Sequence, residues 1–151
     1  MKKFEDLTIQ KILVIGQALP AVKQKYPYDT TMFYDWLIEC GVSKEKAQEI
    51  FDFEAVYNKF PGFAQGGGHK VPTVEQMDEH WPELESKLKS SDKVWILGNV
   101  AFDYIYSKPR TWAHNMHVIR TMHPSKMNLN RYRRDKEKIL SQIKIILHGN
   151  I

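Results

Sequence analysis

Two short apolar runs with a similar pattern stand out along the chain. KILVIG at Lys11–Gly16 and KVWILG at Lys93–Gly98 each hold four consecutive apolar residues and end in glycine. Continuous aliphatic runs of this length are typical of strands covered on both faces, as in a parallel sheet. Weaker runs at Asp52–Tyr57 and His117–Met122 predict two further strands.

Segments with helical spacing separate these strands. Each has a residue that can begin a helix: in order, Asp29 or Thr30, Ser43, Thr73 in a capping box with Gln76, Asn99, and Asn130. Apolar residues recur three or four positions apart behind these starts, as at Phe33, Trp36, Leu37 and Cys40, at Met77, Trp81, Leu84 and Leu88, and at Ile139, Ile143, Ile146 and Leu147. Gly41, Ile50 and Tyr106 mark the predicted ends of the first, second and fourth helices.

The alternation of strands and helices predicts an α/β layered fold with a parallel sheet. In such sheets, ligands bind beyond the carboxyl ends of the strands. Polar residues and turn formers gather at all four of these ends: Gly16-Gln17-Ala18, Asn58–Pro61, Gly98-Asn99 and His123-Pro124-Ser125. The strand pattern therefore places the candidate site at this edge.

Length and composition narrow the class of protein. A chain of 151 residues fits one domain, which we expect to span residues 1–151. Cys40 is the only cysteine, which excludes an internal disulfide, a cysteine-based zinc site and a cysteine-ligated iron–sulfur cluster. The N-terminal MKKFEDLTIQ carries acids, and no apolar run approaches the ~18 residues of a membrane span. We expect a cytoplasmic protein without a membrane partner.

The net charge of +4 is unevenly distributed. Residues 107–151 hold ten Lys or Arg against two Asp or Glu, whereas residues 1–106 hold twelve against sixteen. Such a concentration of positive charge favours a polyanionic partner such as a nucleic acid. The alternative is a solvated basic helix.

Three segments could carry chemistry. His123, after the fourth strand, can donate a hydrogen bond to a developing oxyanion, and Ser125 and the arginines that follow can hold phosphate. Gln17 and Ala18 can contact a ligand or a water, and Tyr28 can stack on a base. The alternatives are an ordinary loop with a capping histidine and a tyrosine that is simply half-buried. His114 and His117 have no third partner at metal-binding spacing, so we expect no metal or other cofactor.

Four blocks in order resemble the uracil-DNA glycosylase superfamily over roughly residues 11–147. They are GQALP at 16–20, KYPYDTTMFYDWLIECG at 25–41, FEAVYNKFPG…GGGHKVPTVEQ…HW between 53 and 81, and KVWILGNVAFDYI followed by MHPSKMNLNRY between 93 and 132. The resemblance implies an α/β/α sandwich around a four-stranded parallel sheet. It also implies metal-free cleavage of the N-glycosidic bond of uracil or another deaminated base in DNA, by a monomer.

The resemblance assigns roles to residues of this chain. His123 would stabilise negative charge on the leaving base, Gln17 would lie near the attacking water, and Met127 would wedge into the duplex in place of the extruded base. Base-binding residues would be Gly16, Ala18, Tyr28 and Asn58. DNA contacts would be Ser125, Lys126, Met127, Asn128 and Arg131.

The chain departs from the family pattern at two places. Family members commonly carry Asp, Asn or Glu in the first motif, where this chain has Gln17 and Ala18. Glutamine can orient a water but cannot act as a general base, so we expect slow turnover. The asparagine that reads the base edge is expected near Ala55, and Asn58 is the nearest substitute. The leading hypothesis is a DNA glycosylase; the alternatives are a catalytically weak or inactive base-binding protein on this fold and an unrelated nucleotide-binding α/β protein.

Overall fold

The computed structural model describes residues 11–22, 24–113 and 116–148. Its centre is a parallel sheet of four strands: β1 (Ile12–Gly16), β2 (Phe51–Ala55), β3 (Lys93–Leu97) and β4 (His117–Thr121). They lie in the order β2-β1-β3-β4. The four predicted strands are confirmed. The second begins one residue earlier and ends two earlier than predicted. The Val56 and Tyr57 amides still bond to the Gly16 and Gln17 carbonyls, beyond the regular ladder.

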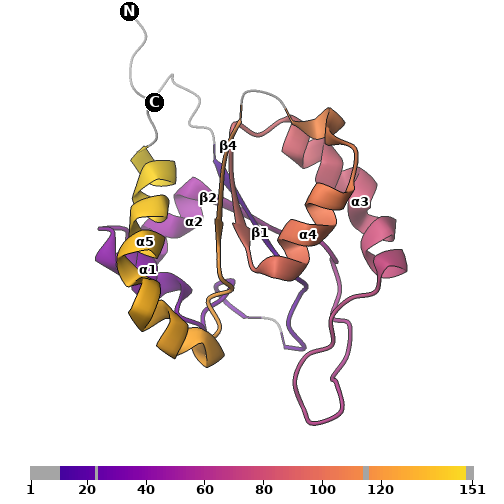
Figure 1. Ribbon diagram of the computed structural model, residues 1–151, viewed down its shortest axis with the longest axis horizontal. Coiled ribbons are helices and arrows are strands. Elements are labelled where there is room, and N and C mark those ends of the chain that lie inside the picture. Colours follow the sequence, from indigo (N-terminus) through magenta and orange to yellow (C-terminus); the bar gives the residue numbers. More distant parts are fainter. Residues whose placement is uncertain (1–10, 23, 114–115, 149–151) are drawn as a thin grey trace, which may run out of the picture.

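Helices cover both faces of the sheet, so the fold is the expected three-layer α/β/α sandwich (Figure 1). The helices are α1 (Phe33–Glu39), α2 (Lys44–Ile50), α3 (Val74–Lys89), α4 (Asn99–Ser107) and α5 (Leu129–His148). Helices α1, α2 and α5 pack on one face, and α3 and α4 pack on the other. Of the helices described, none is long and apolar enough to cross a bilayer.

The apolar runs of β1 and β3 supply the core of both layers. Val14 and Trp95 face α1 and α5, while Leu13 and Ile96 face α3 and α4. Successive side chains of a strand point to opposite faces, so an unbroken apolar run is needed when both faces are covered. Phe33 of α1 stacks on Trp95 with ring centroids 5.1 Å apart. Each large side chain buried in this way contributes about 1.5–3 kcal/mol.

Two of the predicted helix starts are confirmed in detail. Ser43 accepts a hydrogen bond from the Lys46 amide at 3.1 Å, and Thr73 and Gln76 form the complete capping box. The prediction that Asp29 or Thr30 caps the first helix is wrong. The cap position belongs to Met32, whose thioether is a poor acceptor, and the Thr31 hydroxyl accepts from the Phe33 amide at 3.1 Å instead. Asp29 pairs with Lys44 of α2.

The prediction that Asn99 caps the fourth helix is also wrong. Asn99 is the first residue of α4, and Gly98 holds the cap position with a φ of +86°. This left-handed conformation favours glycine. The last helix begins at Leu129, one residue before the predicted start, and bends at Asp135.

The strand order creates a crevice. From β1 the chain passes to β2 on one side, then crosses to β3 on the other side of β1. Such a reversal separates the loops that leave neighbouring strands and opens a crevice at their carboxyl ends. The loop that follows β2 extends beyond this edge, at the bottom of Figure 1.

Candidate functional site

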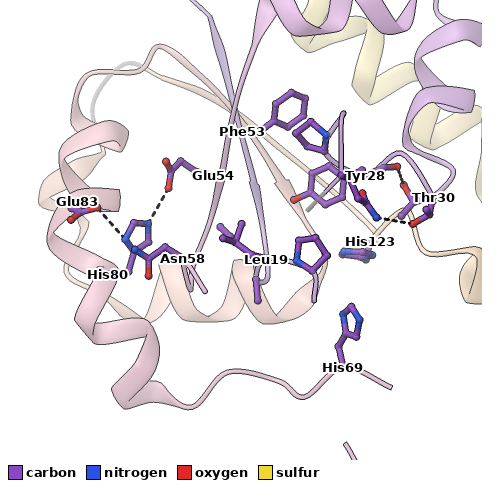
Figure 2. Close-up of a pocket in the computed structure, with 16 residues that line it drawn as sticks. Leu19, Tyr28, Thr30, Phe53, Glu54, Asn58, His69, His80, Glu83 and His123 are labelled. Carbon is purple, nitrogen blue, oxygen red and sulfur yellow. Dashed lines mark hydrogen bonds and ion pairs between the residues drawn. The ribbon is translucent and has the colours of Figure 1, made fainter. Parts of the chain in front are cut away.

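A pocket of about 490 Å³ lies at the carboxyl edge of the sheet, the edge expected from the strand pattern (Figure 2). Four residues singled out from the sequence line it: Ala18, Tyr28, Asn58 and His123. Gly16 and Gln17 are not among the described residues of the pocket wall. The carbonyl of Gln17 instead accepts from the Tyr57 amide at 3.2 Å, which ties the first loop to the second.

Tyr28 forms an aromatic wall of the pocket. Its backbone has a φ of +63°, and its ring packs beside Phe33 and Phe53, with centroids 5.3 and 6.1 Å away. Its hydroxyl lies directly against Gly16, where only glycine leaves room. Burial raises the pKa of this hydroxyl well above its ordinary value, so it stays protonated at neutral pH. Tyr28 is therefore both packed on the core and a pocket residue.

His123 faces Tyr28 across a corner of the pocket. The two rings meet edge to face, with centroids 6.0 Å apart and planes at 73°. A Cβ on Gly98 would lie 3.3 Å from the Cβ of His123, so the glycine after β3 lets the histidine approach β3 closely. Burial lowers the pKa of the His123 imidazole, and the nearby His69 lowers it further. A neutral imidazole results, with one N–H available as a donor.

The loop that carries His123 is fastened at three points. The side-chain Nδ2 of Asn128 donates to the His123 carbonyl at 2.9 Å, and the Ser125 hydroxyl accepts from the Met127 backbone amide at 3.2 Å. The Met32 amide donates to the Pro124 carbonyl at 2.8 Å. Within this turn the Met127 side chain is 94% exposed. A large apolar side chain is thus held outward beside the pocket by an ordered loop.

A second, basic groove of about 320 Å³ lies between β4 and α5. Its positive side chains are Arg120, Arg131 and Lys138. Arg120 donates to the Asn99 side chain at 2.6 Å, and its guanidinium lies 3.9 Å from the centre of the Phe102 ring. Among the described residues Arg120 has no carboxylate partner, so a pre-oriented guanidinium faces solvent. The charge excess of residues 107–151 pointed to this region, but not to Arg120.

An ionic network that sequence reasoning missed lines the far end of the pocket. Glu54 of β2 accepts from His80 Nε2 at 3.0 Å and from Lys87 Nζ at 2.7 Å. Burial alone would raise the pKa of the Glu54 carboxyl, but these two hydrogen bonds outweigh it and the pKa is lowered. The carboxylate stands next to Ala55, where the resemblance placed a base-reading asparagine, and Asn58 lines the same end. The sequence feature that could have indicated this network is Glu54, an acidic residue within a half-buried strand.

No cluster of three or more His, Cys, Asp or Glu is placed to hold a metal ion within residues 11–22, 24–113 and 116–148. His117 is exposed at the start of β4. His114, the other histidine considered as a metal ligand from the sequence, lies outside the described residues.

Comparison with protein families gives a match over most of the chain. Residues 4–144 fit the family model of the uracil DNA glycosylase superfamily, which covers nearly the whole chain. A search of the curated proteins found no match to the chain.

Proposed function

The chain belongs to the uracil DNA glycosylase superfamily, and from that premise we propose that it hydrolyses the N-glycosidic bond of uracil, or of another deaminated base, in DNA. The observation that carries this proposal is the meeting of His123 and Tyr28 in one pocket at the sheet edge, with centroids 6.0 Å apart. A flat base that is turned out of the DNA would find an aromatic wall and a hydrogen-bond donor side by side.

In the proposed reaction His123 acts on the leaving base. As the bond between C1′ and the base nitrogen breaks, its electron pair moves onto the base, and the neighbouring carbonyl oxygen becomes negative. The neutral His123 ring donates its N–H to that oxygen without giving up a full proton. A pre-oriented donor in a partly desolvated pocket stabilises such charge strongly, and loss of one donor typically costs about 10²–10³ in rate.

Met127 and the basic residues near it account for DNA binding in this proposal. The outward-facing Met127 side chain suits insertion into the gap that an extruded base leaves. Lys126 and Ser125 lie on the same turn, and the groove with Arg120 and Arg131 continues from it along β4 and α5. Cationic groups placed in this way would neutralise backbone phosphates on one side of the extruded nucleotide.

A second candidate function is base or nucleic-acid binding without turnover. It is favoured by the first loop, because Gln17 is not among the described pocket residues and Ala18 has no polar side-chain atom. Neither residue supplies a proton acceptor for the attacking water.

The decisive experiment is base release from a uracil-containing single-stranded oligonucleotide at enzyme excess, with no metal added. Parallel single-stranded substrates carry hypoxanthine or xanthine, and a duplex substrate carries a mismatched thymine. We expect alkali-labile sites with the unaltered protein and none with His123→Ala, while both proteins give the same circular dichroism spectrum. Binding without release from any substrate would favour the second candidate.

A further inference from the structure

Among the residues that the structure describes, the pocket wall holds six titratable side chains, and most of them are already engaged. They are Tyr28, Glu54, His69, His80, Glu83 and His123. The Tyr28 hydroxyl packs on Gly16, and the Glu54 carboxylate accepts from both Lys87 and His80. The Glu83 side chain is 76% exposed at the rim. If His123 stabilises the leaving base, His69 is the remaining group.

His69 makes neither a hydrogen bond nor an ion pair within the part of the chain that the structure describes. Its ring instead lies at a steep angle to the rings of Phe60 and Phe63, with centroids 5.3 and 5.7 Å away. His69 is exposed on this loop, and these two contacts support one side of its ring while its nitrogens have no partner among the described residues. An imidazole that is positioned but unbonded at a pocket mouth is free to accept a proton.

The backbone of the loop aims this ring. Phe63 and His69 form an antiparallel bridge, and the Lys70 amide donates to the Gly62 carbonyl at 2.9 Å. Gly66 and Gly67, with φ of +98° and +95°, make the turn between them. The segment is therefore a small hairpin. In Figure 2 His69 points from this hairpin toward His123.

We propose that His69 is a catalytic residue that accepts a proton from the attacking water, an inference that rests on the proposed glycosylase function. In this step the water oxygen bonds to C1′ while the bond from C1′ to the base breaks. The electron pair of that bond leaves with the base, and His69 takes one proton of the water. The base anion, stabilised by His123, is then protonated by solvent. In this proposal His69 accepts the proton of the water, the role that a carboxylate in the first loop would otherwise have, and His123 stabilises the base anion.

The groups around His69 include a second imidazole, a cation and a carboxylate. His123 faces it across the pocket, Lys70 is its charged neighbour in the hairpin, Glu83 of α3 lies on the same pocket wall, and Phe60 and Phe63 carry no charge. A base must be unprotonated to accept a proton, so the acidic limb of the pH–rate profile should depend on which residue stands at position 69. General-base help is worth typically ~10²–10⁴-fold.

The test is the single-turnover rate of base release from pH 5 to 9, with DNA affinity measured separately. His69→Gln should lower the maximal rate by about 10²-fold or more, flatten the acidic limb of the profile and leave the dissociation constant nearly unchanged. His69→Glu restores a proton acceptor and should regain part of the rate. His117→Gln, the same change at an exposed histidine on the opposite edge, should match the unaltered protein.

Two results would overturn the inference alone: a His69→Gln rate and pH profile like those of the unaltered protein, or a loss confined to DNA affinity. Absence of base release by the unaltered protein from every substrate would overturn the proposed function together with it.

Discussion

The Tyr28 hydroxyl occupies the space beside Gly16 so completely that a Cβ built on the glycine would lie 1.9 Å from the hydroxyl oxygen. Gly16 ends β1 and Tyr28 lies in the loop before α1, and their contact sets how deep the aromatic wall sits. Any side chain at position 16 therefore displaces Tyr28 from the pocket. The glycine that ends β1 serves the site through this contact, without itself facing the pocket.

We expect Gly16→Ala to lower the free energy of unfolding by about 1–3 kcal/mol, the usual cost of overpacking. Base release should fall with it, because Tyr28 moves. Urea unfolding and the release assay measure the two effects. Adding Tyr28→Phe to Gly16→Ala removes the clashing oxygen and should recover part of the lost stability. Gly68→Ala, where an added Cβ meets nothing within 4 Å, should leave the unfolding midpoint in place.

His123 should make stability depend on pH. Burial, assisted by His69, lowers its pKa below the ordinary 6.5 in the folded protein. The unfolded chain then takes up a proton near that pH that the folded protein accepts only at lower pH. The free energy of unfolding should therefore decrease as pH falls from about 7 to about 5. His123→Gln should make this decrease shallower in urea titrations at the two pH values, and an unchanged slope would contradict the assignment.

Met127 should matter for duplex DNA and hardly at all for folding. Its side chain is 94% exposed, so Met127→Ala should change the free energy of unfolding by less than about 0.5 kcal/mol. Release of the base from duplex DNA should slow much more than release from single strands, since only the duplex has a stack to fill. Ile145→Ala, which truncates another exposed apolar side chain, is the matched control. Equal slowing on both substrates would contradict the wedge.

Arg120 should contribute one phosphate contact. Each neutralised phosphate steepens the dependence of log affinity on log salt by about 0.9 in duplex DNA. Arg120→Ala should therefore make the slope shallower by about that amount, in fluorescence anisotropy titrations between low and moderate salt. Lys89→Ala removes a charge at the end of α3, away from the groove, and should leave the slope unchanged. If both variants change the salt slope equally, the groove does not contribute a specific phosphate contact.

The fold was predictable wherever burial dictated the residues. The runs in β1 and β3 must be apolar because both faces are covered, and the Thr73–Gln76 box bonds only within its own turn. The errors fell where tertiary contacts decided. The Asp29 carboxylate pairs with Lys44 and therefore does not cap the nearby helix. The φ of +86° at Gly98 cannot be predicted from the pattern of apolar residues.

The location of the site followed from topology, but its composition followed only in part. Ala18 faces the pocket, whereas Gln17 stands at the bend that follows β1 and is not among the described residues of the wall. The pairing of Glu54 with His80 joins residues 26 positions apart. It depends on how α3 packs on β2, and no local pattern encodes that packing.

The bond from the Met32 amide to the Pro124 carbonyl joins the start of α1 to the loop that bears His123. Any separation of that loop from α1 would leave the Met32 N–H without this acceptor and open to exchange with solvent. The hydrogen-exchange rate of the Met32 amide therefore reports how often this loop separates from α1, and it can be measured in the free protein without substrate.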